Sequence, residues 1–305
     1  MSSRPVEQST NAQQPGQDSA EQDAQAASRR AKVTVREVDT VAGLLGVAEL
    51  FSQVWDAPLV APMPHDLMRS LAHAGGRVHA AFREAHLVGA CVAIFGPPAE
   101  TSCYSLIAGV KPGAEGHGIG LALKLAQRAW ALRAGASHMT WTFDPLLRRN
   151  ARFNIARLGA VVTEYLVDFY GQIADGVNDQ ETDRLAVTWA LRTPLPGSMH
   201  SSGRPSAPEP EGDAATAILV AGRRGEPVVI PGGAANLEAG NDRIVRLRCW
   251  IPEDVMSARR TNPELARRWR LAVREVLGGA LGDGYRITGM MEPGWYVLEK
   301  AEAGR

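Results

Sequence analysis

Three glycines at alternate positions, Gly116, Gly118 and Gly120, have the spacing in this sequence that most suggests chemistry. They follow an apolar stretch and precede a long segment with apolar residues at helical spacing. The first turn of a helix has unpaired N–H groups and a positive dipole end, which together bind phosphate oxygens. Glycine lets the backbone approach those oxygens closely and adopt positive φ. The pattern therefore predicts a site for a diphosphate group, with a plain tight turn before a helix as the alternative.

Two other glycine-rich phosphate motifs do not fit this segment. A dinucleotide-binding fingerprint that began at Gly116 would need a glycine at position 121, which is Leu121. A P-loop would need Gly-Lys followed by Ser or Thr, and the cluster does not contain it. The histidines show no metal-ligand spacing with one another or with the cysteines, so no metal is expected.

Apolar periodicity places the glycine cluster inside a mixed α/β domain. Strands are expected at 33–38, 78–83, 86–95, 102–110, 138–143, 161–170 and 184–191. Helices are expected at 41–55, 66–73, 118–133 and 147–158. On the helix at 118–133 we expect Lys124, Gln127 and Arg128 to face away from the apolar stripe. The order of elements indicates a mixed sheet with helices on both faces.

The rest of the chain is expected to form a tail, a linker and a smaller unit. Residues 1–30 are predicted to be disordered because they have few apolar side chains to bury. Five prolines mixed with Gly and Ser predict a linker at 193–215. The domain boundaries are then 31–192 and 216–305, the second being a small α+β unit. Its helix carries Arg267, Arg268, Arg270 and Arg274, which we interpret as a solvated face.

The strand before the glycines ends in Val110-Lys111-Pro112 and is followed by Glu115 and the glycine cluster. This run resembles the signature of the GNAT acyltransferase superfamily, a strand ending Val-x-Pro and then Arg/Gln-x-x-Gly-x-Gly/Ala. The order of elements from 33 to 191 fits that family's fold. The resemblance implies that backbone amides hold the pyrophosphate of an acyl-coenzyme A, from Gly116 through His117, Gly118, Ile119 and Gly120 to Leu121. It also implies a pantetheine arm beside Ala108, Gly109 and Val110, and the smaller unit would be a truncated pseudo-repeat or a lid.

Two positions depart from the family pattern. Glu115 replaces the usual Arg or Gln, so we expect its carboxylate to turn outward or to be offset by His117 and Lys111. The tyrosine that protonates the leaving thiolate in many members is Ile155 here. Residues 140–146, 149–154 and 158–159 are similar to a poorly characterised branch of predicted acetyltransferases, in which N-succinylation of amino acids is one related activity.

Acyl transfer to an amine needs a deprotonated amine, a polarised carbonyl and a proton for the leaving thiolate. Asp144 directly follows the strand at 138–143, so it is a candidate base or ammonium ligand, although Asp-Pro also fits a helix N-cap. Asn150 and Asn154, spaced i, i+4, are candidates to contact the pantetheine arm or thioester, or they belong to a solvated helix face.

Three further side chains are candidates for proton transfer or substrate binding. Tyr165 and Tyr170 are candidates for the missing acid because the pKa of a phenol is close to that of a thiol, with packed strand aromatics as the alternative. Arg184, beside Asp183, is a candidate to recognise a carboxylate, or the two form a surface ion pair.

The composition agrees with a soluble acyltransferase. Lysine and arginine together number 33, and so do aspartate and glutamate together. The formal net charge is therefore zero and does not indicate binding to nucleic acid or to an anionic membrane. No apolar run approaches a membrane span and no signal pattern begins the sequence, so a cytoplasmic protein with buried, reduced cysteines is expected. The prediction is an N-acyltransferase that transfers an acyl group from acetyl-CoA or succinyl-CoA to a small amine, such as an amino acid. A homodimer is compatible with this prediction. The alternative is a non-catalytic acyl-CoA-binding protein.

Overall fold

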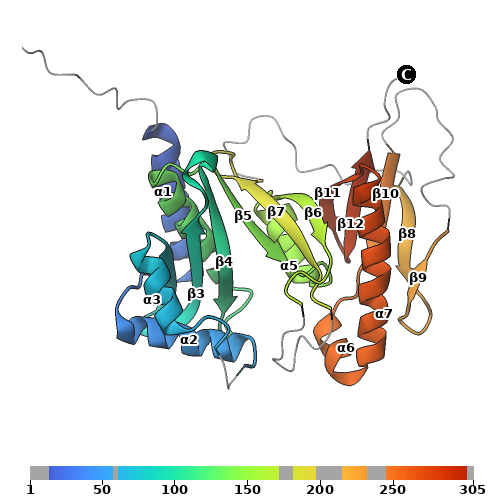
Figure 1. Cartoon of the computed structure of the whole chain (residues 1–305), viewed down its shortest axis with the longest axis horizontal. Coiled ribbons are helices and arrows are strands. Elements are labelled where there is room, and N and C mark those ends of the chain that lie inside the picture. Colours follow the sequence, from blue (N-terminus) through green and yellow to red (C-terminus); the bar gives the residue numbers. More distant parts are fainter. Residues whose placement is uncertain (1–13, 58–60, 172–180, 197–214, 232–244, 301–305) are drawn as a thin grey trace, which may run out of the picture. The chain divides into compact units, whose positions relative to one another are not determined.

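The computed structural model describes residues 14–57, 61–171, 181–196, 215–231 and 245–300, with side chains from Asp18 onward. The chain divides into two compact units, residues 1–139 and 140–305 (Figure 1). The division falls inside β5 (His138–Phe143) rather than in the expected linker at 193–215. Residues 1–13 of the expected tail and 197–214 of the expected linker lie outside the described residues.

The first unit contains four antiparallel strands in the order β1-β2-β3-β4. They are β1 (Thr34–Glu37), β2 (Arg77–Arg83), β3 (His86–Phe95) and β4 (Ser102–Val110). Each lies within one residue of its predicted position at either end, because alternating apolar side chains and the turn at 84–85 are local signals.

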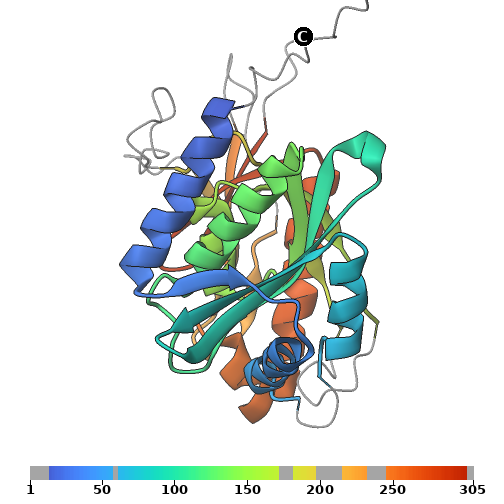
Figure 2. The ribbon, with the colours of Figure 1, turned by 90° about the vertical axis from the view of Figure 1, so that its left-hand side faces the viewer.

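Helices lie on both faces of these strands (Figure 2). They are α1 (Gln14–Ala31), α2 (Val41–Val54), α3 (His65–His73) and α4 (Ile119–Arg133). Ala80 and Ala90 pack in one core with Phe51 of α2, whereas the Sγ of Cys91 lies 3.8 Å from the carbonyl oxygen of Leu123 in α4. Successive strand residues point to opposite faces, so one strand contributes to both helical layers.

Helix α1 corrects the prediction of a disordered tail, which is wrong for residues 14–30. Ala20, Ala27 and Ala31 are buried along one side of α1. Arg128 of α4 donates to the carboxylate of Asp23 at 2.9 Å. Small alanines allow the two helices to pack closely. The alanine face of α1 gives little signal in the sequence, because alanine contributes little to an apolar pattern.

The second correction in this unit concerns the polar side chains of α4. Lys124, Gln127 and Arg128 are buried rather than facing water. The Nζ of Lys124 donates to Ser105 Oγ at 2.7 Å, and Ser105 donates to Gln127 Oε1 at 3.0 Å. Burial lowers the pKa of Lys124 to about 8. Helix α4 is covered on two sides, by the strands and by α1, which the sequence pattern of one amphipathic stripe did not predict.

The second unit begins with the end of β5 and continues through the order β5-β7-β6. Helix α5 (Arg148–Arg152) runs directly into a π-helical segment (Phe153–Arg157), then β6 (Val161–Leu166) pairs antiparallel with β7 (Arg184–Ala190). The predicted helix at 147–158 is confirmed in position. The predicted strand at 161–170 is wrong at its end, because the chain turns after Leu166.

A five-stranded sheet in the order β11-β12-β10-β8-β9 completes the second unit. Its strands are β8 (Ala215–Ala221), β9 (Pro227–Val229), β10 (Val245–Trp250), β11 (Arg286–Met291) and β12 (Trp295–Lys300). Its helices are α6 (Val255–Thr261), α7 (Pro263–Val273), a π-helical segment (Arg274–Gly278) and α8 (Gly279–Gly282). The α+β class is confirmed, whereas the pseudo-repeat and the lid remain predictions.

Buried polar contacts explain why residues 140–192 belong with the C-terminal sheet. Arg270 of α7 donates to both carboxylate oxygens of Asp144, at 2.8 and 2.7 Å. The Tyr296 hydroxyl donates to the carbonyl oxygen of Pro145 at 2.8 Å. Arg270 is 1% exposed, so the prediction of a solvated arginine face is wrong at this position. Composition predicts a linker at 193–215 but cannot reveal the ion pairs between residues on either side of it.

Candidate functional site

The glycine cluster forms the turn between β4 and α4. Gly113, Gly116 and Gly118 have φ values of 83°, 81° and 82°, the left-handed region that favours glycine. Gly118 is the N-cap residue of α4 and makes no side-chain capping bond. The cluster was therefore read correctly as a strand–turn–helix element, with positive φ at two of the three glycines.

The start of α4 has unpaired donors. The first intrahelical bond runs from Ala122 N–H to Gly118 O at 3.0 Å, so the amides of Ile119, Gly120 and Leu121 precede it. A Cβ added at Gly116 would meet no atom within 4 Å. Free amides, a positive helix end and open space above glycine together fit a diphosphate group.

Glu115 is held against its own turn. Its Oε2 accepts a hydrogen bond from Gly113 N–H at 2.7 Å, and the Nδ1 of His117 lies 3.3 Å from the carbonyl oxygen of Ala114. The carboxylate thus binds back onto the turn through a backbone partner two residues away, which is neither of the two arrangements expected for it. Lys111 is exposed in the same segment.

The three predicted pantetheine contacts at the end of β4 differ in their exposure to solvent. Ala108 is exposed and Val110 is partly exposed, so both are accessible. Gly109 is buried, and a Cβ there would lie 3.0 Å from the ring of Trp55, the residue that follows α2. A change of register in the β3–β4 pairing marks a bulge near Leu106, and bulges bend a strand. Gly109 can therefore contact a ligand only through its backbone.

Asp144 is fully engaged by arginines. Besides the two bonds from Arg270, its Oδ2 accepts from Arg259 Nη2 at 2.6 Å, and its Oδ1 accepts from Leu146 N–H at 2.9 Å. Burial alone would raise the pKa of Asp144, but Arg270 and Arg259 hold it well below its usual range. Neither a general base nor a helix N-cap fits these contacts, since α5 begins after Leu147.

Tyr165 donates its hydroxyl proton to Asp183 Oδ2 at 2.7 Å. Arg274 binds the same carboxylate through Nε and Nη2, at 2.9 and 2.7 Å. Burial raises the pKa of Tyr165 and the Asp183 carboxylate raises it further. The predicted role as an acid is disfavoured, because a phenol bound this way releases its proton less readily than a free one.

Asn154 lies inside the unit, at 2% exposure. Its Oδ1 accepts from Trp141 Nε1 at 3.2 Å, and its Nδ2 donates to Asn150 Oδ1 at 3.0 Å. Both polar ends of Asn154 are thus occupied by its neighbours, whereas Asn150 is partly exposed. The geometry supports Asn154 as a residue that orients Asn150 rather than as one that reacts.

Tyr170 and Arg184 are the more accessible members of this region. Tyr170 is 47% exposed, and its hydroxyl lies 3.5 Å from Thr142 Oγ1 on β5. The Arg184 guanidinium lies 5.1 Å from the centre of the Tyr170 ring and donates to the carbonyl oxygen of Asp183 at 2.9 Å. Arg184 forms no ion pair with a carboxylate of the described residues. The side chains of Asp183 and Arg184 therefore do not form the surface ion pair that was the alternative interpretation.

No family model matches the sequence, and no curated protein matches it. Solved structures similar to it include a protein from Desulfovibrio desulfuricans described as an acetyltransferase of the GNAT family (16% identity, TM-score 0.41). An N-acetyltransferase from Staphylococcus aureus is 12% identical with a TM-score of 0.44. Both matches cover 52% of this chain, and 99% and 98% of the other chains. A Salmonella typhimurium protein described as an acetyltransferase, solved with its cofactor acetyl-CoA, is 16% identical over 55% of this chain and 98% of its own, with a TM-score of 0.44. All three are described as acetyltransferases.

The arginines that surround Asp144 and Asp183 were the main omission of the sequence reasoning. Arg259 was not singled out, and Arg270 and Arg274 were read as solvated. One signal was available: Arg270 lies four residues after Ala266 and seven before Leu277, both buried, so it occupies the apolar stripe of its helix. An arginine at a stripe position needs a buried carboxylate, and Asp144 is that carboxylate.

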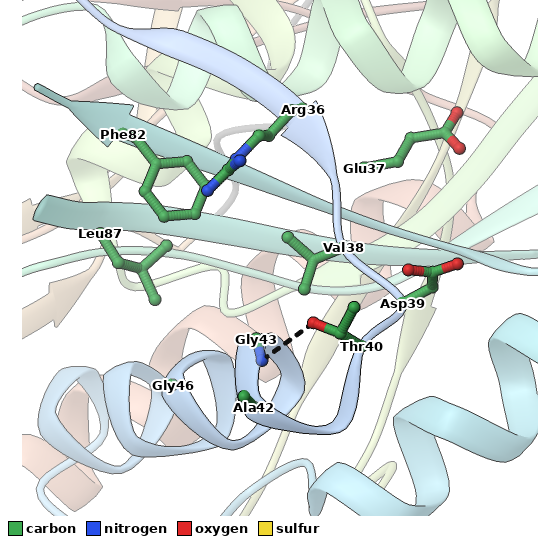
Figure 3. A pocket seen from close by; sticks show the side chains of 10 residues that line it. All are labelled: Arg36, Glu37, Val38, Asp39, Thr40, Ala42, Gly43, Gly46, Phe82 and Leu87. Atoms are coloured by element: carbon green, nitrogen blue, oxygen red, sulfur yellow. Dashed lines mark hydrogen bonds between the residues drawn. The ribbon is translucent and has the colours of Figure 1, made fainter. Parts of the chain in front are cut away.

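A pocket of about 320 Å³ lies at the start of α2 in the first unit (Figure 3). Several of its polar side chains already have partners, since the Arg36 guanidinium lies 4.2 Å from the Phe82 ring centre and Thr40 accepts from Gly43 N–H at 3.3 Å. Glu37, which also lines the pocket, pairs with Arg77 at 3.1 Å.

Three further observations concern the described residues alone. They contain no cluster of three His, Cys, Asp or Glu side chains suited to a metal ion. None of their helices is long and apolar enough to cross a membrane. Cys91, Cys103 and Cys249 are free and buried as predicted, and burial raises the pKa of Cys91 to about 12.

Proposed function

We propose that the protein is an acyl-CoA-dependent N-acyltransferase of the GNAT superfamily that transfers an acetyl or succinyl group directly to a small amine. The observation that carries this proposal is the row of unpaired backbone amides at the start of α4. These amides follow Gly116 and Gly118, both of which have positive φ. A diphosphate group needs such donors, and coenzyme A contains one. The resemblance at Val110-Lys111-Pro112 supports the same assignment.

The first unit would supply the donor site. Backbone amides from Gly116 to Leu121, including His117, would hold the pyrophosphate. The pantetheine arm would pair beside Ala108 and Val110. Gly109, which has no side chain and is covered on its other side by Trp55, would contribute backbone groups only. Fixing the thioester in this way lowers the entropic cost of bringing it to the amine.

The candidate groups for proton transfer lie on residues 140–192. Tyr170 replaces Tyr165 as the candidate acid, because it is exposed and its hydroxyl lies near that of Thr142. The neutral amine nitrogen attacks the thioester carbon and the carbon–sulfur bond breaks. The leaving sulfur takes a proton for which Tyr170 is the candidate donor, the nitrogen releases one proton to water, and water restores the proton of Tyr170. Asp144 would position Arg259 and Arg270 rather than accept a proton, and Asn154 would position Asn150.

The acceptor would carry a carboxylate, as an amino acid does. Two carboxylates, Asp144 and Asp183, are surrounded by Arg259, Arg270, Arg274 and Arg184, which leaves positive charge in excess. Arg184 is the member of this group without a carboxylate partner among the described residues. The same excess would suit a succinyl group on the donor.

A second candidate function is acyl-CoA binding without catalysis. It is favoured by Ile155 in the place of the usual tyrosine, and by the hydrogen bonds that occupy Asp144 and Tyr165. The two functions differ in one measurable way, since only the enzyme releases free thiol.

Calorimetric titration with coenzyme A, acetyl-CoA and succinyl-CoA tests the donor site. We expect micromolar binding that Gly118→Trp abolishes, with the preferred acyl form naming the donor. Thiol release with a panel of amino acids and matched amines then tests catalysis, and Tyr170→Phe should lower kcat. Donor binding without thiol release for any amine would favour the binding protein, and no binding by any donor would reject both functions.

A further inference from the structure

Helix α1 runs antiparallel to α4 and ends where α4 begins (Figure 2). Glu21 pairs with Arg133 at 2.7 Å, near the far end of α4, and Asp23 pairs with Arg128 at 2.9 Å. At the other end, a Cβ added to Gly118 would lie 3.7 Å from the Cβ of Ala31. These three contacts fix the register of the two helices and bring the last turn of α1 to the glycine turn.

The end of α1 is held in one conformation. Lys32 adopts a left-handed φ of 53°, its N–H donates to Arg29 O at 3.1 Å, and Val33 N–H donates to Ser28 O at 3.0 Å. This is a helix-ending bond pattern of the Schellman type. Val33 is buried and leads directly into β1, so the helix end cannot swing away from the strands.

Arg30 and Lys32 flank Ala31 in the chain, and both are exposed. Neither forms an ion pair with any acidic side chain in the part of the chain that the structure describes. The third cation nearby, Arg29, lies two positions from the buried Ala27 and so on the opposite side of the helix from α4. Two uncompensated cations therefore lie next to the turn that leads into the unpaired amides of α4.

The glycine turn itself carries one exposed cation, Lys111. Position 115 holds a glutamate, whose carboxylate is bound to Gly113 N–H. One lysine and backbone amides do not balance a doubly charged phosphate together with this carboxylate, so binding would gain from further positive charge. The end of α1 supplies such charge beside the turn, through the contact between Ala31 and Gly118.

We propose that Arg30 and Lys32 of α1 bind a phosphate group of the acyl-CoA held at the start of α4. The inference rests on the proposed function and extends it, because it makes the N-terminal helix part of the donor site. Coenzyme A offers two such groups, the diphosphate and the 3′-phosphate of its ribose. Both are anions that an arginine and a lysine recognise in the same way.

The test is calorimetric titration of the intact chain with acetyl-CoA at low salt. The double variant Arg30→Gln with Lys32→Gln should bind up to about 25-fold more weakly, since an exposed ion pair contributes up to ~1 kcal/mol, about fivefold each. Arg29→Gln is the matched control, with the same charge change on the same helix, and should stay within about twofold. The difference between the double variant and the wild type should shrink as salt is added.

Dephospho-coenzyme A, which lacks the 3′-phosphate, distinguishes the two phosphate groups. If the double variant binds it as tightly as the wild type does, the cations bind the 3′-phosphate, and if binding is still weakened, they bind the diphosphate. Equal affinity of wild type and double variant for acetyl-CoA, with Gly118→Trp still abolishing binding, would overturn the inference and leave the proposed function intact. If the wild type bound no acetyl-CoA, the proposed function would fail, and this inference with it.

Discussion

Single residues of the second unit show how burial changes the role that a side-chain type suggests. Asp144 was a reasonable base by position, because it follows a strand whose end is expected to face the substrate. With four hydrogen bonds from Arg270, Arg259 and Leu146, it cannot easily accept a proton. Its two arginine partners lie more than a hundred residues away in the sequence, so no local pattern could have revealed them.

Removing the charge of Asp144 should destabilise the protein strongly. In Asp144→Asn the Arg270 guanidinium stays buried without a carboxylate, and we expect a loss of about 3–5 kcal/mol in the free energy of unfolding. Urea denaturation at pH 7 measures it. The matched control is Glu21→Gln, which breaks the exposed pair with Arg133 and should cost less than about 1 kcal/mol. Equal effects of the two changes would contradict the buried network.

His79 should make stability depend on pH. Burial, together with the charges of Arg133 and Arg77, lowers its pKa to about 4, so the folded protein keeps the ring neutral where the unfolded chain protonates it. The unfolded state then binds more protons between the ordinary pKa of histidine and about 4, and stability must fall as pH falls through that window.

The expected size of this effect is roughly 3 kcal/mol between pH 6.5 and pH 4. His79→Phe should flatten that part of the profile, measured as unfolding free energy in urea at half-unit steps of pH. Asp144 contributes below this range, because its lowered pKa means that its stabilisation is present above the ordinary aspartate pKa and lost only in stronger acid. An unchanged slope in His79→Phe would assign the acid sensitivity to other groups.

At the scale of elements, the sequence predicted most strands and helices within a residue or two. Period-two and helical apolar patterns are local, and they identified β3, β4 and the glycine turn before α4. Helix α1 was missed because its buried face is made of alanines, and its neighbours are polar. The burial of Arg128 on α4 could not be predicted for the same reason, since it depends on the contact with Asp23 of α1.

The glycines of the turn before α4 should respond differently to alanine. Gly118 has a φ of 82°, so Gly118→Ala should cost about 1–2 kcal/mol of stability through backbone strain. Gly120 lies inside the helix with ordinary φ, and an added Cβ would lie 4.0 Å from Val110 Cγ2. Gly120→Ala should therefore stabilise the helix by up to about 1 kcal/mol. Thermal unfolding monitored by circular dichroism measures both, and destabilisation by Gly120→Ala would show that the helix start is more crowded than described.

The contact between α1 and α4 can be tested on its own. Ala27 is buried, so Ala27→Glu would place a carboxylate in a closely packed interface and should cost about 2–4 kcal/mol. Gln25→Glu adds the same charge at an exposed position of the same helix and should be neutral within about 0.5 kcal/mol. Urea denaturation compares the two, and equal stability would mean that α1 does not pack on α4 in solution.

At the scale of the whole molecule, the division of the chain follows buried polar contacts rather than composition. The proline-rich segment at 193–215 predicts a boundary, yet Asp144 and Asp183 on one side bind Arg270 and Arg274 on the other. In a fragment containing residues 1–192, both carboxylates would lack their arginines. The carbonyl oxygen of Pro145 would also lose its hydrogen bond from Tyr296. Each lost partner of a buried charge costs several kcal/mol, which is a large share of the stability of a domain.

We therefore expect the fragment 1–192 to be unstable alone, although cutting the chain should be harmless. A protease site inserted at 205 allows the folded protein to be nicked, and the two pieces should stay together on size exclusion with the melting temperature of the intact chain. The fragment expressed separately should unfold at a much lower temperature or fail to fold. A separate fragment as stable as the nicked complex would contradict this, because the ion pairs of Asp144 and Asp183 would then contribute nothing to the stability of residues 140–192.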